Sequence, residues 1–181
     1  MQIGVYCSSA QGLAPAYYEA GEAFGRMLAR RGHGLVYGGY DQGIMGAVAR
    51  GVAAEGGRVT AVVPAIFEKP GYGQQGCHRV IHTETMHARK AAMEQEADAL
   101  AVLPGGIGTY DEFFEAYVLK SLGQLDKPLA VYNWNGCCDA LAALLADSAA
   151  RGMLSAPNRA LVPFFTQAEP LLDWLEQHAR P

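Results

Sequence analysis

The chain has 181 residues, of which half are hydrophobic and 18% are charged, and its formal net charge is −4. This composition is typical of a single globular domain, here residues 1–181, and excludes a disordered chain. The absence of a basic stripe argues against nucleic acid as the main partner, and no apolar run is long enough to span a bilayer.

The four cysteines form no Cys-x-x-Cys pair and resemble no disulfide framework; they stand at positions 7, 77, 137 and 138. We therefore expect reduced thiols in a cytoplasmic protein, and the first residues, MQIGVYCSSA, predict a strand and not a signal peptide. Cys77, His78, His82 and His87 cluster in the sequence. Their spacings match no standard zinc pattern, so we expect ordinary strand and loop residues there and no bound metal.

Short apolar runs alternate with helical patterns from one end of the chain to the other. The apolar runs predict strands at residues 2–9, 34–39, 58–64, 79–84, 99–106, 127–133 and 160–165. The helical patterns predict helices at residues 15–31, 47–55, 87–96, from about 109 onward, 139–151 and 169–179. This alternation indicates parallel βαβ units, so the expected fold is a one-domain α/β protein with a Rossmann-like open parallel sheet of about six to seven strands and helices on both faces.

Ligands of open α/β sheets bind beyond the carboxyl ends of the strands. The segments expected there are residues 7–9, 38–46, 68–76 and 105–112. Two of these segments are glycine-rich turns that lead into helices, and helix N-termini attract phosphate through their unpaired backbone N–H groups.

The turn GGIGT lets the backbone approach an anion closely, because Gly105, Gly106 and Gly108 have no Cβ. Its spacing is neither the dinucleotide fingerprint nor a P-loop, so one monophosphate is the expected ligand. Alternatively, these glycines only shape a strand-to-helix turn. The ligand site is favoured by a second glycine-rich turn, which contains Gly38, Gly39, Gly43 and Gly46.

Two acidic residues, Asp111 and Glu112, follow the GGIGT turn. Residues 109–112, TYDE, match the S/T-x-x-E capping box, so capping explains Glu112, and the helix dipole explains Asp111. One argument opposes this structural explanation. An ionised carboxylate close to a bound phosphate costs electrostatic energy, so a carboxylate at this position suggests a functional role. Arg89 and Lys90 also allow a functional and a structural explanation. Two cations near a helix start are unfavourable for the helix dipole, and the structural explanation is a solvated basic turn.

Taken together, two segments resemble the Lonely Guy (LOG) family of cytokinin riboside 5′-monophosphate phosphoribohydrolases, long labelled lysine decarboxylases. PGGIGTYDE matches the family pattern P-G-G-x-G-T-x-x-E, and MHARK matches M-H-x-R-K. The 23 positions from Arg89 to Glu112 are the separation expected in that family. LVYGG and VYCSS are similar to the family's second glycine loop and first strand end, so the resemblance runs from about residue 3 to residue 155.

The resemblance implies hydrolysis of the N-glycosidic bond of a nucleoside 5′-monophosphate, such as AMP or a cytokinin nucleotide, to the free base and ribose 5-phosphate. It implies that Arg89 and Glu112 are the catalytic pair. It also implies a homodimer with active sites near the subunit interface. No cofactor is expected. The residues expected to bind the phosphate or the rest of the substrate are Gly105, Gly106, Ile107, Gly108, Thr109, Lys90, Gly38, Gly39, Gly43, Ser8 and Glu68.

In this reaction, departure of the base builds positive charge on the ribose. Glu112, kept ionised by the helix end, would stabilise that charge and orient or deprotonate water. Arg89 is not expected to be a general acid, because guanidinium keeps its proton in proteins; it would fix Glu112 or hold a ribose hydroxyl or phosphate. Departures from the family pattern at Tyr40, Gly71 and Val118 leave the base preference open.

Two other functions compete with this hydrolase. A nucleotide or molybdenum-cofactor carrier on the same fold shares the glycine turn but does not need Arg89 and Glu112. A pyridoxal-phosphate decarboxylase needs a Schiff-base lysine, and Lys90 is the only lysine near the expected site. The presence of both Arg89 and Glu112 favours the hydrolase.

Overall fold

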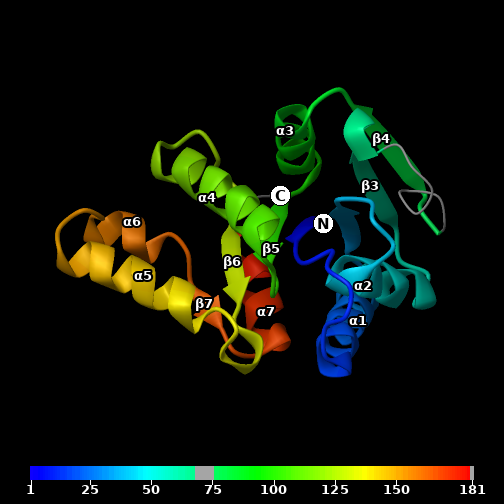
Figure 1. The fold of residues 1–181 in the computed structure, drawn as a ribbon, viewed down its shortest axis with the longest axis horizontal. Coiled ribbons are helices and arrows are strands. Elements are labelled where there is room, and N and C mark those ends of the chain that lie inside the picture. Colours follow the sequence, from blue (N-terminus) through cyan, green and yellow to red (C-terminus); the bar gives the residue numbers. More distant parts are fainter. Residues whose placement is uncertain (68–75, 180–181) are drawn as a thin grey trace.

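The computed structural model describes residues 1–67 and 76–179 and contains a seven-stranded, all-parallel sheet covered by helices (Figure 1). The strands are β1 (Gln2–Tyr6), β2 (Gly34–Tyr37), β3 (Val59–Pro64), β4 (Arg79–Thr83), β5 (Ala99–Val102), β6 (Leu129–Tyr132) and β7 (Phe164–Phe165). The helices are α1 (Pro15–Arg30), α2 (Gly43–Ala54), α3 (Met86–Glu96), α4 (Ile107–Ser121), α5 (Asp139–Ala150), α6 (Ala156–Ala160) and α7 (Ala168–His178), with short 3-10 turns η1 (Ala65–Phe67) and η2 (Trp134–Gly136). Within the described ranges, no helix is long and apolar enough to cross a membrane.

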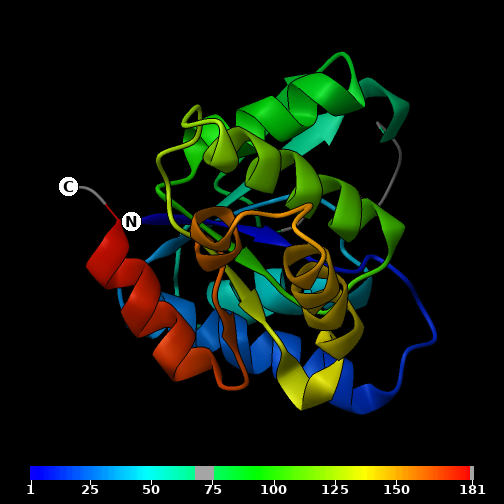
Figure 2. The same cartoon turned by 90° about the vertical axis from the view of Figure 1, so that its left-hand side faces the viewer.

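Two apolar layers join the helices to the sheet. Alternate residues of a strand point to opposite faces, so Ile3 and Val5 pack in one cluster with residues of α1, α2 and α7. Tyr6 packs in a second cluster with residues of α3, α4 and α5. Figure 2 shows α3 and α4 on one side of the sheet and α1 and α2 on the other. The expected α/β sandwich is therefore confirmed.

The order of the strands in the sheet indicates where a ligand is expected to bind. It is β4-β3-β2-β1-β5-β6-β7, so the chain winds outward from β1 to one edge and then from β5 to the other. Open α/β sheets bind ligands where the winding direction reverses, which here is the crevice between the carboxyl ends of β1 and β5. The backbone N–H of Ser8 donates to the carbonyl of Pro104 at 3.0 Å and joins the two strand ends there.

Two helices begin two or more residues earlier than expected from the sequence. α2 begins at Gly43 and not at residue 47. Gly43 has a φ of 66°, and a Cβ there would lie 2.6 Å from the carbonyl oxygen of Ser8, so the glycine lets the helix start against the β1–α1 loop. α4 begins at Ile107, two residues before Thr109, because the extended backbone of Gly106 forms the N-cap.

The C-terminal part of the sheet also differs from expectation. A short helix, α6, was not predicted; its N-cap is Ser155, whose hydroxyl accepts a hydrogen bond from the N–H of Asn158 at 3.3 Å. Because α6 includes Ala160, only Phe164–Phe165 of the strand predicted at 160–165 remains as β7.

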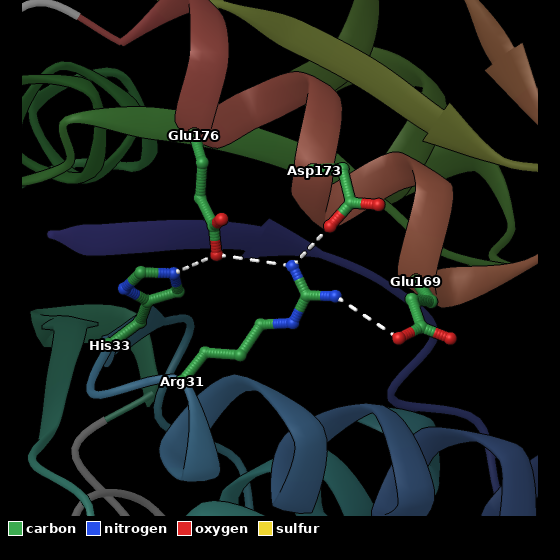
Figure 3. Close-up of polar contacts among 5 residues, drawn as sticks. All are labelled: Arg31, His33, Glu169, Asp173 and Glu176. Carbon is green, nitrogen blue, oxygen red and sulfur yellow. Dashed lines mark hydrogen bonds and ion pairs between the residues drawn. The ribbon is translucent and has the colours of Figure 1, made fainter.

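α7 is fastened to the α1–β2 connection by a group of charged side chains (Figure 3). Arg31 contacts Asp173 at 2.6 Å, Glu176 at 3.2 Å and Glu169 at 3.6 Å, all on α7. His33 adds a contact from its Nε2 to Glu176 at 2.8 Å. The hydrogen bond with His33, followed by that with Arg31, lowers the pKa of Glu176. The ionised form of Glu176 is therefore the one that holds α7 in place.

We predict that Glu176→Gln lowers the free energy of unfolding at about pH 7, by roughly 0.5 kcal/mol for a partly exposed ion pair. Because the folded-state pKa of Glu176 is lowered, its contribution is complete above the unfolded value of about 4.3 and is lost as the pH falls through the folded-state value. Urea unfolding of both proteins should show the difference at about pH 7 and its disappearance in acid. Glu19→Gln, at an exposed position of α1, is the matched control; a difference that stays constant with pH would contradict the prediction.

Candidate active site

A cavity of about 330 Å³ lies at the carboxyl ends of β1, β2 and β3 and reaches the first turns of α3 and α4. This volume is at the low end of the range for small-molecule sites, about 300–1,000 Å³, and suits a ligand no larger than a mononucleotide. The lining residues are Cys7, Ser8, Ser9, Ala10, Gly38, Tyr40, Met45, Phe67, Met86, Arg89, Gly106, Ile107, Gly108, Thr109 and Glu112.

The N-terminus of α4 forms the polar wall of the cavity. Its N-cap is Gly106, and no side chain caps the helix, so its first backbone N–H groups are available to an anion. A Cβ added at Gly106 or Gly108 would meet nothing within 4 Å, so the backbone there borders open space. At Gly105 an added Cβ would collide with the side chain of Thr109. The predicted cradle therefore lines the cavity from residue 106 to residue 109, and Gly105 makes room for Thr109.

Ser8 lines the same cavity from the end of β1. Its hydroxyl accepts a hydrogen bond from the N–H of Ala10 at 3.1 Å, and its backbone carbonyl accepts one from the N–H of Met45 at 3.0 Å. These bonds fix the β1–α1 loop against α2, so the position of Ser8 in the wall is set by backbone contacts.

The second glycine turn contributes less directly than the sequence suggested. Gly38 lines the cavity, whereas Gly39 and Gly43 are not among its lining residues. Their φ values of 80° and 66° show that they shape the turn. The predicted contact Glu68 and the departure from the family pattern at Gly71 lie outside the described residues.

Arg89 and Glu112 form a buried ion pair in the cavity. The Nη1 of Arg89 donates to Oε1 of Glu112 at 2.6 Å, and the side chains are 5% and 6% exposed. Any Cβ at Gly38 would collide with the guanidinium of Arg89, which explains the glycine at that position. Burial raises the pKa of Glu112, while the charge and hydrogen bond of Arg89 oppose that rise. Glu112 is therefore a more basic carboxylate than an exposed glutamate, and Arg89 is the group that stabilises its charge.

The sequence-based capping explanation of Glu112 is wrong. Thr109 is the third residue of α4 and not its N-cap, so residues 109–112 do not form a capping box. The carboxylate of Glu112 bonds to Arg89 and not to the helix start, and the expectation that the helix end keeps it ionised is corrected accordingly. Asp111 lies beyond the first turn and contacts the Nζ of Lys90 at 2.9 Å, so it is not a helix-start acid.

Lys90 clamps α3 to α4 and does not line the cavity. Its ammonium contacts Asp111 at 2.9 Å and also contacts Glu115, and its side chain is only 10% exposed. Burial by itself lowers the pKa of Lys90, but the hydrogen bonds with Glu115 and Asp111 outweigh burial and leave that pKa raised. With Arg89 and Lys90 both buried, the explanation as a solvated basic turn is wrong. The contact of Lys90 with substrate stays a prediction; in the structure Lys90 contacts Asp111 and Glu115.

The apolar part of the cavity was largely missed from the sequence. It is formed by Tyr40, Met45, Phe67 and Met86, of which only Tyr40 had been singled out as a residue that could line the site. Phe67 follows β3 and Met86 begins α3, so their place after strand ends was the available signal. Val118 is 54% exposed on α4 and is not among the lining residues, so that departure from the family pattern does not touch the cavity.

Comparison with known proteins gives matches to a family model, to curated relatives and to solved structures. The model of a family described as "Possible lysine decarboxylase" matches residues 45–175. The chain is 35% identical over 181 residues to a probable cytokinin riboside 5′-monophosphate phosphoribohydrolase of Oryza sativa subsp. japonica, covering 99% of this chain and 73% of that protein. It is 36% identical over 164 residues to a cytokinin riboside 5′-monophosphate phosphoribohydrolase of Rhodococcoides fascians, covering 88% and 81%.

A solved structure shares the fold at lower identity. The molybdenum cofactor binding protein from Rippkaea orientalis superposes with a TM-score of 0.71 at 19% identity, covering 97% of this chain and 95% of that one. At this identity the likeness establishes the architecture only.

We predict that Lys90→Met lowers the free energy of unfolding by about 1–3 kcal/mol, because it leaves two carboxylates on α4 without their buried counter-charge. Asp111→Asn is the matched control and should cost less than about 0.5 kcal/mol, since Asp111 is 57% exposed and Lys90 keeps Glu115. Chemical unfolding measures both. If Lys90→Met were as stable as the wild type, Lys90 would not be a clamp.

Proposed function

The chain belongs to the Lonely Guy family of cytokinin riboside 5′-monophosphate phosphoribohydrolases, and on that premise we propose that it hydrolyses the N-glycosidic bond of a nucleoside 5′-monophosphate such as AMP or a cytokinin nucleotide. The products are the free base and ribose 5-phosphate. The observation that carries this proposal is the buried pair of Arg89 and Glu112 in one small cavity with the uncapped N-terminus of α4.

The proposed phosphate position is the first turn of α4. The backbone N–H groups from Gly106 to Thr109 and the helix dipole supply the attraction, and no lysine is needed there. Glu112 lies one to two turns further along the same helix, so a ligand anchored by its 5′-phosphate extends its ribose toward that carboxylate. The repulsion expected between an acid and a phosphate is avoided because Arg89 balances the charge of Glu112.

Glu112 acts on the sugar in this proposal. As the bond from C1′ to the base breaks, positive charge develops on the ribose, and the carboxylate stabilises it in a site that excludes most water. The base leaves with the electron pair of that bond and takes a proton from solvent; water adds its oxygen to C1′, and Glu112 accepts the proton that this water loses and returns it to solvent. Burial raises the pKa of Glu112, which makes it a better acceptor. Arg89 keeps its proton throughout and holds Glu112 in place.

The base occupies the apolar part of the cavity. Tyr40 and Phe67 offer aromatic surface, and Met45 and Met86 offer polarizable thioethers that adapt to a flat ring. These four side chains all come from outside α4, so in this proposal the base and the phosphate contact different walls of the cavity.

The two competing functions fit the site less well. A pyridoxal-phosphate decarboxylase needs a lysine at the cavity, and of the described lysines Lys90, Lys120 and Lys127 none lines it; each is engaged by a carboxylate or a backbone carbonyl. A molybdenum-cofactor carrier has no use for a buried acid–guanidinium pair, and the support for it is a likeness of fold alone.

We predict that Glu112→Gln and Arg89→Ala each reduce kcat/KM by about 100-fold or more, because the first removes the carboxylate that stabilises the transition state and the second removes the group that holds this carboxylate in place. The assay is release of free base from AMP and from isopentenyladenosine monophosphate, followed by chromatography. Asp111→Asn, next to Glu112 but outside the cavity lining, is the matched control and should stay near wild-type activity. Circular dichroism and thermal unfolding check that each variant folds, since Arg89→Ala leaves Glu112 buried without its partner.

Wild-type activity in Glu112→Gln would remove Glu112 from the mechanism. No base release by the wild type from any purine or pyrimidine monophosphate would favour the carrier function. Relative rates on AMP, GMP, CMP and prenylated AMP define the base preference that Tyr40 helps to set.

We also propose that the protein is a homodimer that pairs through α4. Phe114 and Val118 of this helix and its C-cap residue Leu122 recur at four-residue intervals and are 37%, 54% and 65% exposed. At the N-terminal end of α4, Ile107 is 86% exposed and also lines the cavity. An apolar stripe that reaches the active site fits a second copy of the chain better than solvent.

We predict that Val118→Glu converts the dimer into a monomer, because it places a charge at the centre of the stripe. Light scattering coupled to size-exclusion chromatography measures the mass. Leu144→Glu, at a 53% exposed position of α5, should leave the dimer intact. A monomeric wild type, or a dimer unaffected by Val118→Glu, would exclude this interface.

We place the protein in the cytoplasm. All four cysteines are free thiols. Cytosolic reductants maintain this state, whereas secreted proteins of this size usually pair their cysteines.

A further inference from the structure

Cys137 and Cys138 form a pair of adjacent thiols at the start of α5. Their Sγ atoms are 3.6 Å apart, within hydrogen-bond distance for sulfur. The preceding residue pair makes a tight turn, with Asn135 at φ 50° and Gly136 at φ 74°. The side chain of Asn133 accepts from the N–H of Cys138 at 2.7 Å and so braces this turn from the end of β6. The two sulfur atoms are therefore held side by side by the backbone.

The two thiols differ in access and in acidity. Cys137 is half-buried and lines a second cavity, of about 370 Å³, which shares Ser8 and Gly106 with the substrate cavity. Cys138 is only 3% exposed and packs in the core under α5. The hydrogen bond from Cys138 lowers the pKa of Cys137, and the same contact followed by burial raises the pKa of Cys138. Cys137 is thus the accessible nucleophile, and Cys138 is the protonated neighbour.

The remaining cysteines lack these features. Cys7 is buried, and burial raises its pKa well above the usual range. Burial also raises the pKa of Cys77, whose sulfur lies 3.4 Å from the hydroxyl of Tyr37. Both remain protonated thiols at neutral pH, so they serve as internal comparisons.

We propose that Cys137 and Cys138 are a modification site for hydroperoxides, which convert them reversibly into a vicinal disulfide. The thiolate of Cys137 attacks one peroxide oxygen; an S–O bond forms, the O–O bond breaks, and the other oxygen leaves as an alcohol or water after taking a proton. Cys138 then attacks the sulfur of the resulting sulfenic acid; an S–S bond forms, the S–O bond breaks, and the hydroxide leaves as water with the proton of Cys138. Two thiols are oxidised and one peroxide is reduced.

The disulfide between Cys137 and Cys138 is expected to be reduced easily. Neighbouring Cα atoms are about 3.8 Å apart, shorter than the roughly 4.4–6.8 Å of ordinary disulfides. The vicinal bond is therefore strained and readily reduced by a dithiol, which takes up the two electrons and is itself oxidised. Such transient disulfides are the kind found in reducing compartments.

The test is peroxide treatment of the folded wild-type chain, followed by catalase, denaturation and alkylation with N-ethylmaleimide. Intact mass and peptide mapping then count the labels. We expect two of the four cysteines to become resistant to alkylation, with the loss of two hydrogen masses located in the peptide that carries Cys137 and Cys138. Dithiothreitol should restore all four labels.

Three serine variants separate the steps. Cys138→Ser should stop at a sulfenic acid on Cys137, which dimedone traps, and Cys137→Ser should form neither the disulfide nor a dimedone adduct. Cys77→Ser, the matched control, should oxidise like the wild type. Full alkylation of all four cysteines after peroxide, a disulfide that involves Cys7 or Cys77, or a dimedone adduct on Cys138 would each overturn the proposal.

Discussion

The ion pair between Arg89 and Glu112 is the interaction around which the site is arranged. Two charges taken out of water are tolerated only when each has a partner in good geometry, and here the N–O distance is 2.6 Å. This requirement accounts for features that are far apart in the sequence. Gly38 has no side chain because the guanidinium occupies that space. Lys90 supplies a second buried cation that contacts Asp111 and Glu115, which are one turn apart on α4, so the charges on the two helices match in register.

The topology of the sheet places the Arg89–Glu112 pair and the N-terminus of α4 in the same cavity. Because all strands are parallel, the turns after β1, β2, β3 and β5 meet at one edge, and the reversal between β1 and β5 leaves a crevice there. The result is one cavity with two kinds of wall. Backbone N–H groups of α4 can bind a phosphate, and the aromatic and thioether side chains that follow β2 and β3 can bind a base. Glu112 lines the same cavity, and in the proposed reaction its carboxylate stabilises the charge that develops on the sugar.

Local motifs were less informative than their combination. T-x-x-E at residues 109–112 satisfied a capping rule, yet the N-cap is Gly106 and α4 begins at Ile107, two residues before Thr109. MHARK suggested a solvated basic turn, yet both cations are buried. In each case the tertiary partner, a residue 21 to 23 positions away, decided the role of the side chain. The adjacent thiols of Cys137 and Cys138 likewise gave no pattern in the sequence, and their different environments arise from the cavity on one side and the core on the other.

The sequence by itself determined the α/β class, the edge of the sheet that carries the cavity, the glycine turn and the choice of Arg89 and Glu112 as the proposed catalytic residues. These follow from apolar periodicity, from the position of turns after strands and from two motifs at a fixed separation, all of which are properties of the chain order. Only the tertiary structure decided that Arg89 bonds to Glu112, that Lys90 joins two helices, and that Phe67 and Met86 complete the apolar wall. Burial and side-chain contact depend on which elements pack together, and no local pattern of residues encodes that.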